Sequence, residues 1–291
     1  MAKLILKDHQ IEGELPSGIS YSKSRLSFAA NKEFIEPIII EIKEDNNESL
    51  IIEVGRSTAV TIILEVSSEE EFDHNYNLKL IAEENTQVKY LLISELNSKN
   101  GFIHHTFEAK KDANLELMGG FVSNILKAKM TAKLLGKGAN VHIRVVAISS
   151  TNNEQNIDIE LIHQAPYSTG LMHNIAIANN NGKIILNGVE KIEQGMIKVD
   201  AYQSLKGIIT SDDAVIEVNP ILLIDEHDIK AGHGATVGKL DEHSIYYLMS
   251  RGLTKKEAEK LMINGLLSPL IDAITDQELK ERFINLVNDR L

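Results

Sequence analysis

A short motif recurs along the chain: a polar residue or glycine, then Ala or Thr, then a stretch in which apolar and polar residues alternate. The apolar residue that opens the alternation is Val60, Val88, Leu115 and Val141 in successive copies, so the copies lie 28, 27 and 26 residues apart. A later copy opens at Val215, 74 residues on, close to three further repeats of about 25 residues. Such a fixed period is typical of a solenoid, whose coils bury their apolar faces only against neighbouring coils. The pattern predicts a mainly β chain folded as a β-solenoid.

Alternation with a period of two also occurs between the copies, as in 78–80 and 157–161. This period is typical of a β-strand with one buried face. Clusters of Asn, Ser and Gly at 97–101, 149–153 and 179–182 predict the turns between strands. A β-sandwich with chance spacing would also place strands every 8 to 12 residues or so, but the regular repeat favours the solenoid.

Near residue 240 the period changes to that of amphipathic helices. Asp241 is a candidate N-cap for a first helix. Thr254 and Glu257 form a capping box for a second helix, because the threonine hydroxyl and the glutamate side chain can each bond the other's backbone N–H. Thr275 and Glu278 form the same box for a third. We therefore expect three short helices at the C-terminal end.

Two residues predict where the first two of these helices end. Gly252 suits the left-handed position after the first helix, and Pro269 is expected to end or kink the second. We divide the chain into an irregular N-terminal cap over 1–37, a β-helix core over 38–239 and a C-terminal helical region over 240–291. A cap is expected because a solenoid must cover its open end.

Composition narrows the functions that the chain can have. A net charge of −12 argues against nucleic-acid binding, which needs a basic surface. No apolar run approaches the roughly 20 residues that cross a bilayer, and Lys3, Lys7 and Asp8 interrupt the start too early for a signal peptide. We therefore expect a cytoplasmic protein with no membrane partner. The absence of cysteine excludes disulfides, thiolate nucleophiles and thiolate metal ligands from this chain.

Motifs of catalysis are missing. The chain has no G-x-S-x-G elbow, no P-loop lysine motif and no H-E-x-x-H, so we expect that it is not an enzyme. A β-helix enzyme acting on polysaccharides is the alternative, but aromatic residues make up only 5% of the chain and tryptophan is absent. Aromatic platforms for sugar rings are therefore scarce.

The ten histidines raise the question of a metal site. His104 and His105 are neighbours, and neighbouring residues of a strand point to opposite faces, so they cannot share one ion. His142 shares a strand face with Arg144, and we interpret both as ordinary outward-facing residues.

Two further groups of residues are considered as metal sites. His163 and His173 lie ten residues apart and could meet across a coil, although nothing in the sequence brings them together. The acidic cluster 225–228 contains one histidine, and we interpret it as a solvated turn rather than a weak site for a divalent cation.

The glycine-rich segment 229–238 differs from these groups. Its glycines miss the G-x-G-x-x-G spacing of dinucleotide loops by one residue. Gly232 and Gly234 flank His233 and would leave its imidazole exposed between small neighbours, ready for a metal or a partner. The alternative is a glycine-rich exit from the last coil in which His233 is hydrogen-bonded locally. The residues alone leave both readings open.

A longer block of residues around this segment closely resembles the C-terminal core of the SufB/SufD family. That family reads P-x-L-x-I, then D-V-K-C-S-H-G-A-T-V-G, then F-Y-L-x-S-R-G. The match is dense over about 183–267, and solenoid character alone carries it over 38–182. The residues of this chain that carry the resemblance are those at 219–224, 228–230, 233–238, 240–242, 246–248, 250–253 and 257–258.

The resemblance implies a right-handed parallel β-helix with a small C-terminal α-helical region. It implies a non-catalytic scaffold subunit of SUF-type iron–sulfur cluster assembly, whose helical region docks an ABC-type ATPase, SufC. On this basis we expect Tyr246, Tyr247, Arg251, Leu261 and Met262 to contact that partner. The family also pairs two scaffold chains through their β-helix ends, where a transient cluster is shared.

The histidine that the family places at this interface carries over as His233, which we expect to act as a shared cluster ligand. Ala231 stands where the family has a cysteine, and Gly232 where it has a serine. This chain alone should therefore hold no cluster stably. The H-G-A-T wording is the SufD-like form, while the short N-terminal part resembles compact single-scaffold versions. A SufB-like partner and a second copy of the chain both remain open, and a His-based metal-binding module is a further alternative.

Overall fold

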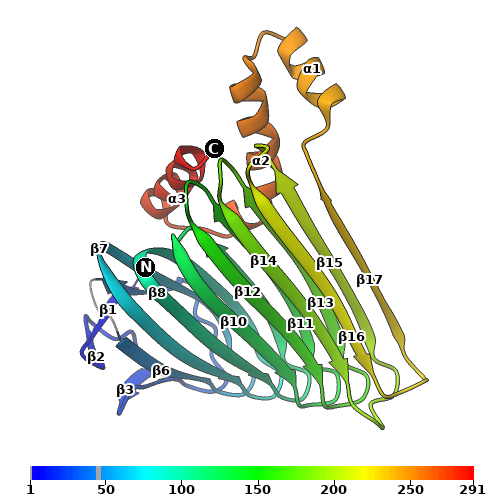
Figure 1. Ribbon diagram of the computed structural model, residues 1–291. Helices are drawn as coiled ribbons and strands as arrows, with labels where there is room; N and C mark the ends of the chain where they lie inside the picture. The colour runs from blue at the N-terminus through cyan, green and yellow to red at the C-terminus, as the bar shows by residue number, and fades with distance from the viewer. Residues whose placement is uncertain (1, 44–46) are drawn as a thin grey trace.

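The computed structural model describes residues 2–43 and 47–291, which form a parallel β-solenoid of about eight turns with three helices (Figure 1). Each coil contributes strands to two opposite faces. The first face consists of β1 (Ala2–Lys7), β5 (Ile38–Lys43), the first parts of β7 (Ala59–Ala82) and β8 (Gln87–Ala109), β9 (Asn114–Phe121), β11 (Asn140–Ser149), β13 (Thr169–Ala178), β15 (Asp200–Ile209) and β17 (Lys230–Gly238).

The second face consists of β4 (Arg25–Phe28), β6 (Asn47–Val54), the second parts of β7 and β8, β10 (Ile125–Leu134), β12 (Glu154–His163), β14 (Lys183–Ile192) and β16 (Val215–Ile224). β7 and β8 continue round the bend from one face to the other, with register shifts where they turn. The predicted β-solenoid is confirmed.

The repeat read from the sequence is the register of the first face. Val60, Val88, Leu115 and Val141 pair in line across β7, β8, β9 and β11. In-register parallel strands place equivalent side chains above one another. The spacing of 28, 27 and 26 residues is therefore the length of successive coils.

The extension of this repeat to Val215 is wrong. Val141 continues to Gly170, Ala201 and Ala231, which are 29, 31 and 30 residues apart. Val215 begins a strand of the second face and pairs with Lys183. The later coils are longer, and the same polar-then-apolar motif starts strands on both faces, so a fixed period leads to the wrong face.

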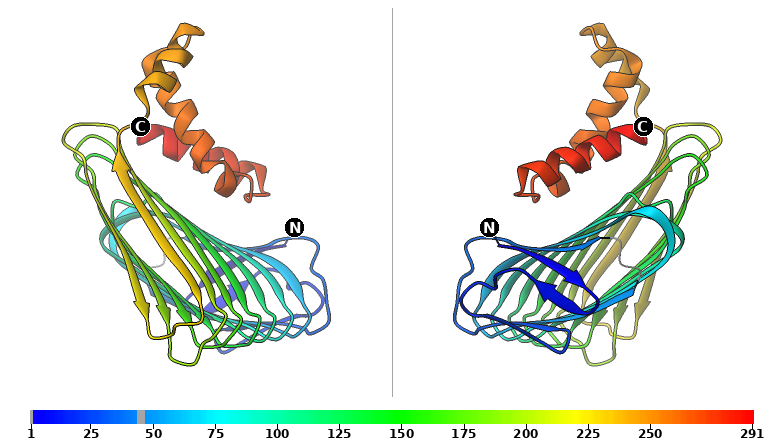
Figure 2. Two further views of the ribbon diagram at one scale, coloured as in Figure 1. Left: turned by 90° about the vertical axis from the view of Figure 1, so that its right-hand side faces the viewer. Right: turned by 90° about the vertical axis from the view of Figure 1, so that its left-hand side faces the viewer.

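The main core lies between the two faces. Alternate residues of each strand point inward, and the resulting cluster runs from Leu4 and Leu6 to Ala214 and Ile216. A second apolar cluster lies on the outer side of the first face, where α2 (Lys255–Ile271) and α3 (Gln277–Asp289) cover it (Figure 2). The C-terminal helices therefore pack onto the wall of the solenoid.

Side-chain packing and an ion pair hold α3 against the outer side of the first face. Phe283 is fully buried and lies over Gly120, where an added Cβ would come within 2.8 Å of the phenyl ring. Arg282 forms an ion pair with Glu65, which is nearly buried, and lies 3.7 Å from Glu95. Only glycine at 120 allows the ring this close to the strand.

The predicted caps hold for the first two helices. Asp241 accepts a hydrogen bond from the backbone N–H of Ser244 at the start of α1 (Glu242–Ser250), and Gly252 follows that helix with a φ of +102°. Thr254 and Glu257 form the expected capping box of α2.

One expectation about the helix ends is corrected, and one of the two alternatives for Pro269 is excluded. The N-cap of α3 is Asp276 rather than Thr275, because the Asp276 carboxylate accepts the backbone N–H of Leu279 at 2.8 Å. α2 does not end at Pro269 but runs on to Ile271. Leu270 and Ile271 are buried against the first face, and this packing offsets the backbone hydrogen bond that proline removes.

The N-terminal segment is more regular than expected. β1 joins the first face beside β5, and β4 joins the second face beside β6. β2 (Gln10–Glu12) and β3 (Ile19–Ser22) pair antiparallel with β1 and β4. The expected irregular cap is therefore built from two short hairpins. Within the described residues, no helix is long and apolar enough to cross a membrane.

Candidate functional site: the open end and the helical arm

The last coil of the solenoid has no coil above it. β16 pairs with β14 and β17 with β15, and the register of the described residues gives neither strand a partner on its outer edge. Figure 1 shows these two strands at the far end from the N-terminal hairpins. Pro220 lies within β16, a position that proline tolerates only in an edge strand or a bulge. We call this surface the open end.

His233 lies in the interior row of the open end. It pairs in register with Gln203, which is fully buried and therefore faces the interior. His233 faces the same way and is exposed because none of the described residues covers the last coil. No hydrogen bond of its imidazole is found among the described residues. Gly232 and Gly234 face outward, where the ring of Tyr202 lies 3.5 Å from a Cβ built at Gly232.

The helical arm, formed by α1 and the first turns of α2, extends beside the open end (Figure 2). Tyr246 is 75% exposed, and Tyr247 and Leu261 are also more exposed than buried. The guanidinium of Arg251 lies 5.2 Å from the centre of the Tyr247 ring. Met262 differs from these residues, because it is half-buried and lines a pocket toward the ends of β15 and β17.

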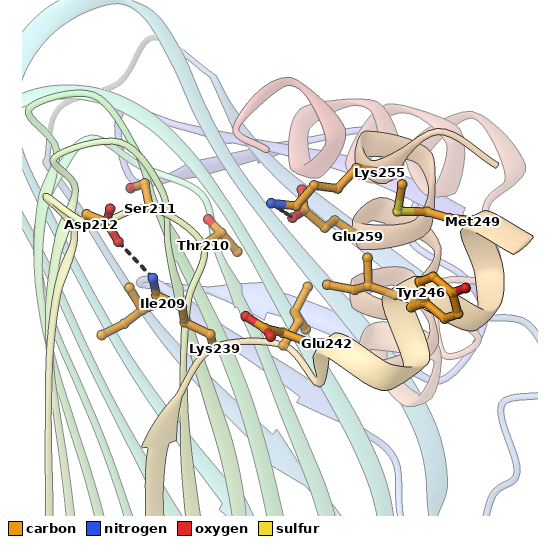
Figure 3. A pocket seen from close by; sticks show the side chains of 12 residues that line it. Ile209, Thr210, Ser211, Asp212, Lys239, Glu242, Tyr246, Met249, Lys255 and Glu259 are labelled. Atoms are coloured by element: carbon orange, nitrogen blue, oxygen red, sulfur yellow. Dashed lines mark hydrogen bonds and ion pairs between the residues drawn. The ribbon is translucent and has the colours of Figure 1, made fainter.

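A pocket of about 540 Å³ separates the arm from the turn between β15 and β16 (Figure 3). Tyr246 and Met249 of α1 line one side, and an ion pair of 2.7 Å between Lys239 and Asp212 lies at the other. This pocket could not be predicted from the sequence, because its walls come from two separate segments, 209–212 and 239–259, that meet only in the fold.

Sequence comparison decides the family. The family model described as "SUF system FeS cluster assembly, SufBD core domain" matches residues 39–266. The chain belongs to the SufB/SufD family. The match covers the solenoid from β5 to β17 together with α1 and most of α2.

Two relatives in the SufB/SufD family carry the SufD name. The iron–sulfur cluster assembly protein SufD of Bacillus subtilis (strain 168) is 29% identical over 250 residues, which cover 84% of this chain and 57% of the relative. The SufD of Escherichia coli (strain K12) is 27% identical over 175 residues, covering 60% of this chain and 41% of the relative. A SufBD family protein of Mycobacterium bovis is 24% identical over 199 residues, covering 68% and 24%. This chain thus spans about half, or less, of the length of these relatives.

The other histidines of this SufBD chain lie where strand geometry puts them. His104 is exposed and His105 is buried, which confirms their opposite faces. Nδ1 of His105 lies 3.1 Å from the Tyr90 hydroxyl, and burial lowers the pKa of His105 to about 3. His163 and His173 do not meet. Instead, His173 lies beside His142, with 3.0 Å between their facing nitrogens.

The interior near the open end contains Glu190 and Gln203, each of which has a buried oxygen without a hydrogen-bond partner among the described residues. Glu190 is fully buried beside His163, whose Nε2 lies 3.4 Å from its carboxylate. Burial raises the pKa of Glu190 to about 8 and lowers the pKa of His163 to about 4, so both groups are neutral at neutral pH. Gln203 donates to the carbonyl of Ile221. In the preceding coils the row that contains Glu190 is apolar and consists of Leu80, Phe107, Ala132 and Leu161, and in the last coil it continues to Leu222.

The acidic cluster 225–228 lies in the turn between β16 and β17. The Glu226 carboxylate accepts the backbone N–H groups of Gly195, His227 and Asp228, and these bonds lower its pKa. Asp228 pairs with Lys198 at 2.7 Å. Across residues 2–43 and 47–291, no three His, Asp or Glu side chains gather into a metal site.

Proposed function

We propose that this chain is a SufD-like, non-catalytic scaffold subunit of iron–sulfur cluster assembly. In this proposal its open end pairs with a second scaffold chain, His233 helps to hold the cluster that is built there, and the helical arm binds a SufC-type ABC ATPase. The observation that carries the proposal is the position of His233, in an interior row that no coil of this chain covers.

The open end has the properties of an interface. Leu223 is 49% exposed and Val237 is 46% exposed, although Val237 belongs to the inward-facing row and its methyl groups approach Gly207. Two edge strands of ten and nine residues present unpaired backbone groups beside these side chains. Exposed strand edges and apolar surface favour association with another chain.

His233 can supply one ligand and no more. The chain has no cysteine, and Ala231 and Gly232 on the same strand offer no ligand atoms. Fe–S clusters are held chiefly by thiolates, with imidazole as the known replacement. A cluster built at the open end would therefore need thiolates or carboxylates from the second scaffold chain. We treat the cluster as the cargo of assembly rather than as a resident cofactor.

The helical arm suits the ATPase because it offers rigid, exposed aromatic rings. Tyr246 and Tyr247 lie on consecutive positions of α1, and Arg251 stacks against the second ring. Tyrosine and arginine are enriched among residues that dominate protein interfaces. Leu261 adds an exposed apolar side chain on α2.

Reconstitution of the cluster tests the role of His233. The chain is mixed with a SufB-like scaffold chain, iron and sulfide, and the bound cluster is measured from visible absorbance. His233→Ala should lower the yield severalfold, whereas His104→Ala, which removes an exposed histidine from the outer side of β8, should leave it unchanged. An equal yield from both variants would contradict the cluster-ligand role.

Affinity for the ATPase tests the arm. Tyr246→Ala combined with Leu261→Ala should weaken binding of a SufC-type ATPase at least tenfold, because hot-spot truncations cost about 2 kcal/mol or more. Glu278→Ala on α3 is the control, since that side chain is also exposed but lies outside the arm. Unchanged binding of the double variant would refute the docking surface while leaving the pairing surface standing.

The number of scaffold chains is an outcome of the same experiments. A chain that dimerises and reconstitutes a cluster by itself would be a single-scaffold version. A chain that stays monomeric until a SufB-like chain is added would be the SufD-like half of a heteromer.

A further inference from the structure

The outer side of the first face carries an imidazole pair that is separate from His233. His142 on β11 and His173 on β13 approach each other diagonally across two neighbouring strands, with 3.0 Å between Nε2 of His142 and Nδ1 of His173. Their ring centres are 5.1 Å apart. His173 is exposed and His142 is half-buried, so an ion from solvent can reach the nitrogens.

We propose that His142 and His173 bind one divalent first-row transition ion, such as Zn²⁺, at a site open to solvent. Imidazole is a preferred ligand of these ions. Two nitrogens 3.0 Å apart subtend roughly 90° at an ion that is about 2.1 Å from each, and a separation of about 3.4 Å gives the tetrahedral angle. A small rotation of both rings therefore changes the contact from a hydrogen bond to shared coordination.

The protonation of the pair favours this role. Metal ions bind neutral imidazole. Burial, Arg144 and His173 lower the pKa of His142 to about 4, and burial and Arg144 lower the pKa of His173. Both rings are thus neutral at neutral pH, and the ring that donates in the contact presents a lone pair to the ion once its proton moves to its other nitrogen.

Nearby charges set the strength of the site. Arg144 opposes a cation, but its guanidinium donates to Glu116 at 2.8 Å, so its charge is largely compensated. Glu116 stands in direct register with His142, and Lys89 lies 3.9 Å from its carboxylate. Glu116 is therefore the side chain that can complete the ion's shell if it leaves Arg144. We expect removal of the Arg144 charge to tighten binding.

The position of the pair makes the site exchangeable and distinct from the open end. It has two protein ligands, and water fills the remaining positions, unlike closed structural sites. The ring of Tyr202 lies 6.2 Å from that of His173, between the pair and β17. Two strand spacings of about 4.8 Å each place His173 about 10 Å from β17, whose His233 faces the opposite side. The site does not depend on the proposed assembly role.

Calorimetric titration of Zn²⁺ into the full, tag-free chain at pH 7.5 tests the proposal, with Co²⁺ absorbance as a report on coordination. The wild-type chain should bind one ion. His142→Asn combined with His173→Asn should weaken that binding at least tenfold, and Arg144→Gln should strengthen it severalfold. His104→Asn, which removes an exposed histidine of β8 outside the pair, is the matched control and should leave the affinity unchanged.

Both substituted histidines are at the surface, so circular dichroism should show the same fold for every variant. Loss of binding in the double variant together with tighter binding by Arg144→Gln supports the site. The proposal is overturned if the wild-type chain binds no Zn²⁺, if the double variant binds it equally well, or if Arg144→Gln leaves the affinity unchanged.

Discussion

At the N-terminal end of the solenoid, the outermost strands β2 and β3 have three and four residues and belong to antiparallel hairpins. At the other end, β16 and β17 have ten and nine residues and leave their outer edges unpaired. Short hairpin edges discourage association, whereas long uncovered edges invite it. The two ends of one fold therefore differ: the capped end has short, paired edges, and the open end has long, unpaired edges that suit the proposed pairing with another chain.

The interior side chains also differ between the capped end and the open end. Near the capped end the interior is made mainly of aliphatic and aromatic side chains such as Leu4, Leu26 and Phe28, and the buried polar groups there, Glu48 and His74, are hydrogen-bonded. Toward the open end it contains Glu190, Gln203 and finally His233. Buried polar groups without full hydrogen bonding weaken a core. Stability is thus concentrated at the capped end, and candidate chemistry at the open end.

The largest expected effect on stability comes from the capped end. Phe28 is buried and packs edge-on against Phe34 with ring centres 5.2 Å apart. Phe28→Ala should lower the free energy of unfolding by about 3 to 5 kcal/mol, as is typical of buried phenylalanine. Val237→Ala at the open end should lower it by less than about 1 kcal/mol, because the side chain is half-exposed. Urea denaturation measures both, and equal losses would refute the contrast.

Scaffold pairing should depend on residues of the open end and not on residues of the capped end. Leu223→Glu combined with Val237→Glu places two charges on the open end and should weaken scaffold pairing by about 2 kcal/mol or more, which is about thirtyfold in affinity. Ile35→Glu at the capped end, where Ile35 is 86% exposed, should have no effect on pairing. Light scattering and calorimetry on the chain alone and with a SufB-like chain measure the affinity. A loss caused by Ile35→Glu would place the interface at the wrong end.

Only part of the solenoid, from the capped end to the open end, could be predicted from the sequence. The repeat at Val60, Val88, Leu115 and Val141 predicted the solenoid because register and coil length are the same quantity in a parallel stack. It failed at Val215 because later coils are longer.

The histidines show a second limit. The opposite faces of His104 and His105 followed from strand geometry alone. The meeting of His142 and His173 depends on the length of the coil between β11 and β13, which the motif spacing did not give. The inward direction of His233 likewise depends on its register with Gln203.

The buried polar groups predict that the free energy of unfolding depends on pH, with an effect of intermediate size. The Glu190 carboxyl has a folded pKa of about 8 against 4.5 when it is not buried. Between these values the folded chain keeps a proton that the unfolded chain releases, so this group makes folding less stable as pH rises. The folded pKa of His163 is about 4 against 6.5, so its own contribution, which has the opposite sign, levels off about one pH unit above 6.5.

Glu190→Gln removes the proton release and keeps the shape of the side chain. Its stability relative to the wild-type chain should increase by about 1 kcal/mol per pH unit between pH 6.5 and 8. Thermal or urea unfolding at the two pH values measures the change. A difference between variant and wild type that does not vary with pH would show that Glu190 is ionised in the folded chain.

The smallest effect concerns the helices on the solenoid wall. Asp276→Ala should cost about 1 kcal/mol, as is usual for the loss of an N-cap. Thr275→Ala should stay within about 0.5 kcal/mol, because Thr275 does not cap α3. Neither change should alter scaffold pairing. If Thr275→Ala were the more costly substitution, the helix would begin one residue earlier, as the sequence motif predicted.

The most direct test of the account uses the absence of cysteine from the chain. Ala235→Cys places a thiol in the exposed interior row of β17, and Ile35→Cys places one at the capped end. The rate of maleimide alkylation of each peptide is followed by mass spectrometry, for the chain alone and with a SufB-like chain. We expect at least tenfold protection at 235 in the paired form, and none at 35. Equal alkylation of the two sites after pairing would contradict it.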